Sequence, residues 1–66
     1  MHRFFVKPEQ IGEREIRILG GDVNHISHVL RMRPGDELCV CDGDKMEYTS
    51  RILEISPEEI RVEILY

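Results

Sequence analysis

The chain has 66 residues and a formal net charge of −4, with 41% hydrophobic and 33% charged residues. A chain this short buries roughly 60% of its unfolded surface, so residues 1–66 are expected to form a single domain with a small core. No run of about 18 apolar residues is present, which excludes a membrane-spanning helix. The N-terminus lacks the apolar segment of a signal peptide, so a cytoplasmic location is expected.

The charges are unevenly distributed. Residues 1–33 hold six Lys or Arg and four Asp or Glu, for a net +2, together with all three histidines, whereas residues 34–66 hold three and nine, for a net −6. The acidic total argues against an autonomous, strongly basic nucleic-acid binder. Any anion-facing surface should therefore come from the first half, although an ordinary solvated acidic protein explains the charge equally well.

Short alternating segments predict the first two strands, over residues 3–6 and 15–19. The first strand places Phe4 and Phe5 on opposite faces, so one should be in the core and the other free to pack elsewhere. The polar residues 7–14 predict a loop. The second strand turns Ile16 and Ile18 inward, and two glycines end it.

One helix is predicted, from about Asp22 to Arg33, with Asp22 as its N-cap. Its apolar stripe consists of residues at helical spacing, namely Val23, Ile26, Val29 and Leu30. Pro34-Gly35 is expected to end it. We expect the barrel to bury Ile26 and Leu30.

Three further strands are predicted over residues 36–41, 45–55 and 59–66. The first has Leu38 and Val40 on one face, and Asp42-Gly43-Asp44 predicts a hairpin turn into the second. The last strand should turn Ile60, Val62 and Ile64 inward, after a turn at residues 56–58.

The strand over residues 45–55 changes its apolar phase. Tyr48 and Ile52 share one face, whereas Leu53 and Ile55 share the other, and a bulge near residues 51–53 would explain the change. Short strands, turn signals and one bulge favour a closed sheet over an open one. The predicted fold is mainly β, a small antiparallel β-barrel of about five strands with one helix in the order ββαβββ.

Three segments form a recognisable pattern: Asn24-His25-Ile26-x-His28-Val29-Leu30-Arg31-Met32, Pro34-Gly35-Asp36-x-Leu38 and Asp42-Gly43. The pattern resembles the N-terminal domain of the RsmE family, whose members methylate N3 of a uridine in 16S ribosomal RNA. The opening Arg3-Phe4-Phe5-Val6 is similar to the start of that family, so the resemblance covers essentially the whole chain.

The resemblance implies a PUA-like barrel that binds RNA as the N-terminal part of a longer chain. It further implies that S-adenosylmethionine binds in a separate C-terminal SPOUT methyltransferase domain, with no cofactor and no catalytic residue in residues 1–66. The implied partners are 16S rRNA or the small ribosomal subunit and the protein's own C-terminal domain, in a homodimeric parent without a membrane association.

The candidate RNA-binding residues are Arg31, His28, His25, Arg3, Arg33 and Asn24. On a helix, His25, His28 and Arg31 recur every three residues and line one polar side, where Arg31 would hold a phosphate and the imidazoles would stack on a base. Arg3 enters through the resemblance. The alternative is structural: the histidines pack on the barrel, and Arg31 pairs with the acidic second half.

Cys39 and Cys41, together with His25 and His28, raise the question of a zinc site. Structural zinc sites usually separate their cysteines by two to four residues, so that one turn wraps the metal. We therefore expect no metal site, no disulfide in a reducing cytosol, and two ordinary half-buried thiols.

Two functions remain open at this point. One is the RNA-binding domain that positions 16S rRNA for methylation by the missing domain. The other is a small barrel that acts as an interdomain or dimer-interface module without nucleic-acid contact, which the acidic second half favours.

Overall fold

A computed structural model describes residues 2–43 and 46–66. The strands are β1 (Arg3–Phe5), β2 (Glu15–Ile18), β3 (Glu37–Cys41), β4 (Glu47–Ile55) and β5 (Ile60–Ile64), and the helical elements are the 3₁₀ turn η1 (Pro8–Gln10), α1 (Gly21–Asn24) and the π-helical turn η2 (His25–Val29). Every strand begins and ends within two residues of its predicted bounds. No helix among the described residues is long and apolar enough to cross a membrane.

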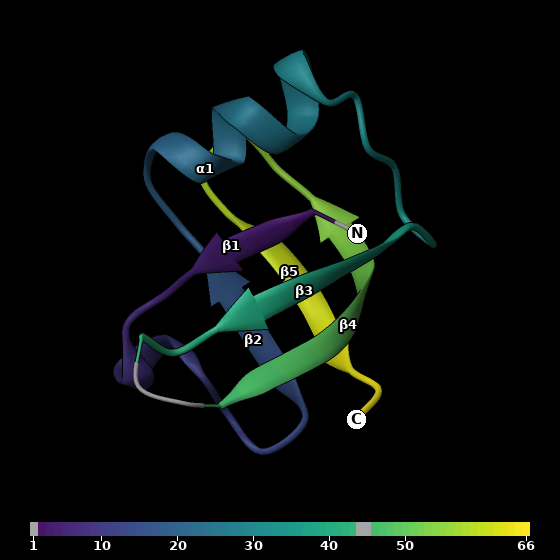
Figure 1. The fold of residues 1–66 in the computed structure, drawn as a ribbon. Coiled ribbons are helices and arrows are strands. Elements are labelled where there is room, and N and C mark those ends of the chain that lie inside the picture. Colours follow the sequence, from purple (N-terminus) through teal and green to yellow (C-terminus); the bar gives the residue numbers. More distant parts are fainter. Residues whose placement is uncertain (1, 44–45) are drawn as a thin grey trace.

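The five strands form one curled sheet in the order β1-β3-β4-β5-β2. The β1–β3 pair is parallel and the other pairs are antiparallel. Figure 1 shows β1, β3 and β4 on the near side, β5 and β2 behind them, and the helix across the upper end. The predicted fold class, a small mainly β PUA-like barrel in the order ββαβββ, is confirmed in the form of a half-barrel.

The core lies between the curled sheet and the helix. Its fully buried apolar side chains come from four strands and the helix: Ile16, Ile18, Ile26, Leu38, Val40, Ile52, Ile60 and Val62. Alternation along the strands puts these residues on the inner face, as predicted. Phe4 is buried, whereas Phe5 on the opposite face of β1 is 66% exposed, which confirms their predicted separation.

The predicted bulge is present in β4, and it explains the change of phase for Ile55 but not for Leu53. Ile52 lies opposite Val62 and Ile55 lies opposite Ile60, with a register shift between Ile52 and Glu54. The extra residue restores the inward phase, so Ile55 packs against the core and Leu53 is left 37% exposed.

The hairpin between β3 and β4 is confirmed by their antiparallel register. Gly43 adopts a φ of 82°, the left-handed conformation that such turns require, whereas Asp44 lies outside the described residues. The predicted loop of residues 7–14 contains η1 and covers the free edge of β2. There Gln10 Nε2 donates to the Arg17 carbonyl oxygen at 2.7 Å. This contact protects an edge strand from pairing with other chains.

Candidate nucleic-acid interface

The helix carries most of the predicted site residues, and its geometry differs from the prediction. It begins at Gly21 after Gly20, whose φ of 72° makes the sharp entry, so Asp22 lies inside the first turn and is not the N-cap. From His25 the helix widens into a π-turn, in which the Leu30 amide donates to the His25 carbonyl at 2.9 Å. Such turns are rare and are often found at functional sites.

The π-turn changes which side chains face the core. A π-turn advances by roughly 80° per residue instead of about 100°, so Val29 falls about 120° from Ile26 while Leu30 stays near it. Accordingly Ile26 is fully buried, Leu30 is half-buried against the core, and Val29 is 61% exposed. The prediction was correct for Ile26, correct in part for Leu30 and wrong for Val29.

The helix ends at Val29 with Leu30 as its C-cap, earlier than the predicted Arg33, because Arg31 takes the left-handed conformation with φ 54°. Among the described residues, Arg31 is the only one other than glycine with a positive φ. The Met32 amide then donates to the Ile26 carbonyl at 3.0 Å, a helix-closing bond one residue wider than usual. A side-chain-bearing residue in this region is strained, and such strain is concentrated at functional sites.

A turn that follows the helix in sequence fixes the backbone of Arg33. The Arg33 amide donates to Asp36 Oδ2 at 2.8 Å, and the Asp36 amide donates to the Arg33 carbonyl at 3.0 Å. This reciprocal pair closes the Pro34-Gly35 turn, in which Gly35 has a φ of 99°. Asp36 therefore holds the backbone of Arg33 and not its guanidinium, and the residue is exposed.

Arg31 and Arg33 meet at a shallow hollow of about 360 Å³ at the end of the helix, lined by Ser27, His28, Arg31, Met32 and Arg33. The Ser27 hydroxyl donates to the Val23 carbonyl at 2.6 Å and lies 3.2 Å from His28 Nδ1. Because the serine proton is already used, Nδ1 is the donor in the second contact, which leaves Nε2 of the neutral ring as a hydrogen-bond acceptor. The hollow thus presents two guanidinium groups and one imidazole nitrogen.

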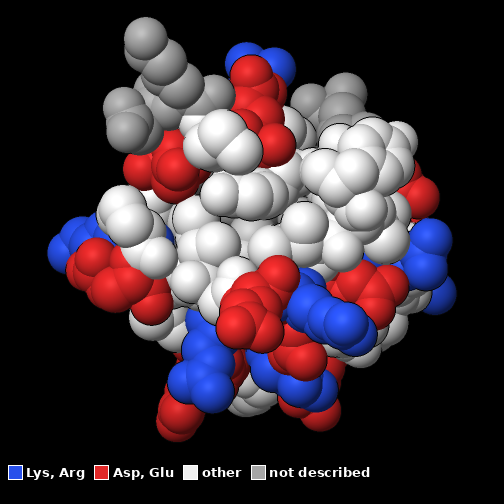
Figure 2. Space-filling model, turned by 90° about the horizontal axis from the view of Figure 1, so that it is seen from below, with Lys and Arg blue, Asp and Glu red and all other residues white. Residues whose placement is uncertain are grey.

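These two arginines are unlike most other arginines of the chain. Four arginines form ion pairs with glutamates across the sheet, namely Arg3, Arg17, Arg51 and Arg61. Within the described residues, neither Arg31 nor Arg33 has a carboxylate partner. Figure 2 shows the end of the molecule away from the helix, where basic and acidic residues alternate around an uncharged centre. Among the described residues, the end of the helix is therefore where two exposed arginines without an ion pair line the same hollow.

The other predicted residues do not line this hollow. His25 is exposed and its ring contacts Phe4 edge-on at 6.3 Å between centroids, a packing role that matches the structural alternative. Asn24 is exposed one residue earlier on the helix. Arg3 lies on β1, where its guanidinium pairs with the Glu47 carboxylate at 3.1 Å. The structure thus brings together His28, Arg31 and Arg33 out of the six.

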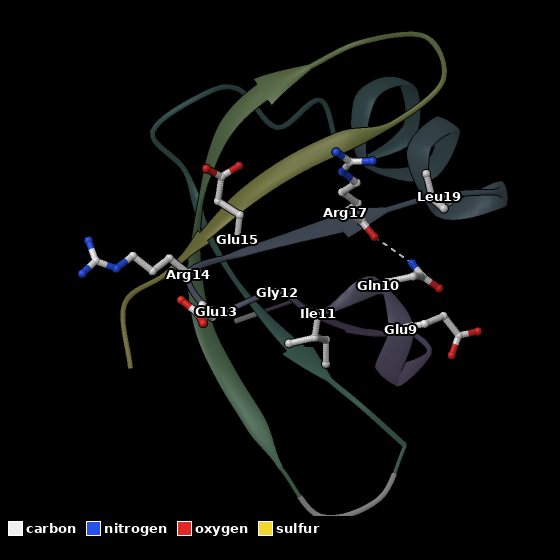
Figure 3. Close-up of a pocket in the computed structure, with 9 residues that line it drawn as sticks. All are labelled: Glu9, Gln10, Ile11, Gly12, Glu13, Arg14, Glu15, Arg17 and Leu19. Atoms are coloured by element: carbon white, nitrogen blue, oxygen red, sulfur yellow. Dashed lines mark hydrogen bonds between the residues drawn. The ribbon is translucent and has the colours of Figure 1, made fainter.

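Another hollow, of about 660 Å³, is an open groove along residues 9–19. In Figure 3 the charged side chains of Glu9, Glu13, Arg14 and Glu15 point away from one another. Glu15 is already paired with Arg61 at 3.1 Å. Without converging groups, the groove offers no site for chemistry.

A second cluster lies on the outer face of the sheet. Ligand atoms of Cys39, Cys41 and Glu47 all lie within 4.8 Å of one another, and the Cys39 thiol donates to Glu47 Oε1 at 3.4 Å. Burial, followed by this hydrogen bond, raises the pKa of Cys39 above its ordinary value. Sequence reasoning weighed the two cysteines with the histidines and missed Glu47. Counting the hairpin register would have placed Glu47 opposite Cys41.

Residues 18–65 match the family described as RNA methyltransferase PUA domain. The chain is similar to a ribosomal RNA small subunit methyltransferase E from Neisseria gonorrhoeae bound to S-adenosyl methionine, with 28% identity and a TM-score of 0.80 over 100% of this chain and 27% of that one. It is similar to the putative methyltransferase Lpg2936 from Legionella pneumophila in complex with bound SAM, with 26% identity and a TM-score of 0.79 over 94% of this chain and 26% of that one.

A predicted RNA methyltransferase from Thermotoga maritima shares the fold at 20% identity, with a TM-score of 0.84 over 100% of this chain and 29% of that one. The chain therefore spans between about a quarter and a third of the length of these solved structures.

Proposed function

Because the chain belongs to the RNA methyltransferase PUA domain family and is RsmE-like, we propose that it binds RNA for a methyltransferase through the hollow at the end of its helix. In the finer form of the proposal, the RNA is 16S rRNA in the small ribosomal subunit. The domain positions it for S-adenosylmethionine-dependent N3 methylation of a uridine by a C-terminal SPOUT domain. The parent is proposed to be a cytoplasmic homodimer.

The observation that carries the proposal is that two guanidinium groups without a carboxylate partner among the described residues line one hollow. A guanidinium binds a phosphate through two parallel hydrogen bonds, and this is the common basis of RNA backbone recognition. Arg31 and Arg33 are proposed to hold phosphates, and His28 Nε2 to accept a hydrogen bond from a base. Asn24, His25 and Arg3 lie outside the hollow and are proposed as secondary contacts only.

The test is Arg31→Ala in the full-length parent, with RNA affinity measured at several salt concentrations. Loss of one phosphate contact should weaken binding and lower the salt slope by about one counterion. Arg14→Ala is the matched control, because Arg14 is also exposed and, within the described residues, unpaired, but lines the groove of Figure 3. It should leave the affinity nearly unchanged.

The second candidate function is the interface module without RNA contact. It is favoured by apolar side chains on the surface, among which Phe5, Val29 and Tyr66 are 66%, 61% and 82% exposed. If Arg31→Ala and Arg14→Ala leave RNA binding and its salt slope equally unchanged, the RNA proposal fails and this alternative replaces it.

A further inference from the structure

The cluster on the outer face of β3 has the composition of a metal site. Leu38 and Val40 point into the core, so Cys39 and Cys41 between and beyond them point to the opposite face. Glu47 is the register partner of Cys41 on β4, which brings its carboxylate to the same face. Three ligand atoms from two paired strands thus converge without any loop.

The distances agree with tetrahedral coordination. With metal–sulfur and metal–oxygen bonds of about 2.3 Å and 2.1 Å, tetrahedral ligands lie about 3.5–3.8 Å apart. Cys39 Sγ and Glu47 Oε1 are already 3.4 Å apart, and no pair within the cluster exceeds 4.8 Å. Side-chain rotations that move the ligand atoms by about 1 Å would bring them to tetrahedral separations while the paired backbones stay fixed.

We propose that Cys39, Cys41 and Glu47 form a binding site for a thiophilic d¹⁰ cation, with Zn²⁺ as the type case and water as the fourth ligand. This replaces the expectation of two ordinary thiols, which rested on turn-type spacing. A strand presents alternate residues on one face, so the third ligand comes from the neighbouring strand and no wrapping turn is needed.

Arg3 completes the arrangement as a positioning residue. Its guanidinium binds the Glu47 carboxylate at 3.1 Å and fixes that ligand, as second-shell groups do in metal sites. Two thiolates, one carboxylate and Zn²⁺ sum to a single negative charge, which the guanidinium offsets. Both thiols lose their protons to the buffer when the two metal–sulfur bonds form, and no electron is transferred.

The test is titration of the reduced chain with Zn²⁺ against a chromophoric chelator. We expect one Zn²⁺ per chain, two protons released, and a melting temperature that rises with Zn²⁺ concentration. Co²⁺ in place of Zn²⁺ should give thiolate-to-metal charge-transfer absorption, which reports sulfur coordination directly.

Two variants and one control make the test specific. Cys39→Ser should abolish the Co²⁺ charge-transfer pattern of two thiolates, and Glu47→Gln should weaken Zn²⁺ binding at least about tenfold. Glu37→Gln is the control, because Glu37 lies on β3 two positions before Cys39 and outside the cluster. Absence of saturable binding, one Zn²⁺ per two chains, or equal effects of Glu47→Gln and Glu37→Gln would overturn the proposal.

Discussion

The left-handed backbone of Arg31 makes a quantitative prediction for Arg31→Gly. A Cβ in this region costs about 1–2 kcal/mol. The extra freedom of glycine in the unfolded chain costs about 0.4–1 kcal/mol. The difference is a net stabilisation of about 0.5–1 kcal/mol, which in a domain of this size raises the melting temperature by about 2–8 °C. Arg31 is exposed and, among the described residues, has no ion pair, so no lost contact offsets this gain.

The assay is thermal and denaturant unfolding of the wild type, Arg31→Gly, Arg31→Ala and Arg33→Gly. Arg33 is the matched control: it lines the same hollow, but its φ is not positive, so glycine there should only destabilise. Arg31→Ala keeps the Cβ and should unfold like the wild type. If Arg31→Gly loses as much stability as Arg33→Gly, the backbone at Arg31 is unstrained and its side chain supports the fold.

Three further outcomes follow from burial and from the composition of the chain. Ile26→Ala should lose about 2–5 kcal/mol of unfolding free energy, whereas Val29→Ala, on the exposed side of the same helix, should lose under about 0.5 kcal/mol; equal losses would contradict the π-turn geometry. The 66 residues alone should give no saturable calorimetric signal with millimolar S-adenosylmethionine, and a clear isotherm would reveal a donor site in this domain. The raised pKa of Cys39 favours its neutral thiol in the folded state, so metal-free protein should lose stability as pH rises above the ordinary thiol value of 9.0, and Cys39→Ser should lose less over that range.

The sheet was predictable because alternation is a local signal with a fixed period. Ile16 and Ile18 on one strand, and Ile60 and Val62 on another, are inward because neighbouring polar residues must be outward. The strand bounds, the β3–β4 hairpin and the bulge in β4 were predicted from the same alternation and the turn residues between the strands. The exposure of Leu53 does not follow from them, because the register with β5 decides which residue of the bulge is left unpaired.

The helix was less predictable because its period changes inside the element. An apolar stripe with 3.6 residues per turn places Val29 inward. The sequence carries no signal that predicts the π-turn, which rotates Val29 outward. The arrangement of the candidate RNA-binding site was equally hard to predict from local sequence. His28, Arg31 and Arg33 were expected as candidates, but whether an arginine is free or paired depends on distant register, as the contact between Arg3 and Glu47 shows.

The order in which the strands pair has a consequence for synthesis of the protein. β3, β4 and β5 pair with their neighbours in sequence, whereas β1 pairs with β3 and β2 pairs with β5, so both strands of the first half lie at the outer edges of a sheet made by the second half. A nascent chain that stops before β5 has no partner strand for β2. The helix that follows β2 then lacks the completed sheet face against which it packs. The helix and the cationic hollow at its end therefore take their final shape only after strands from both halves of the chain have paired.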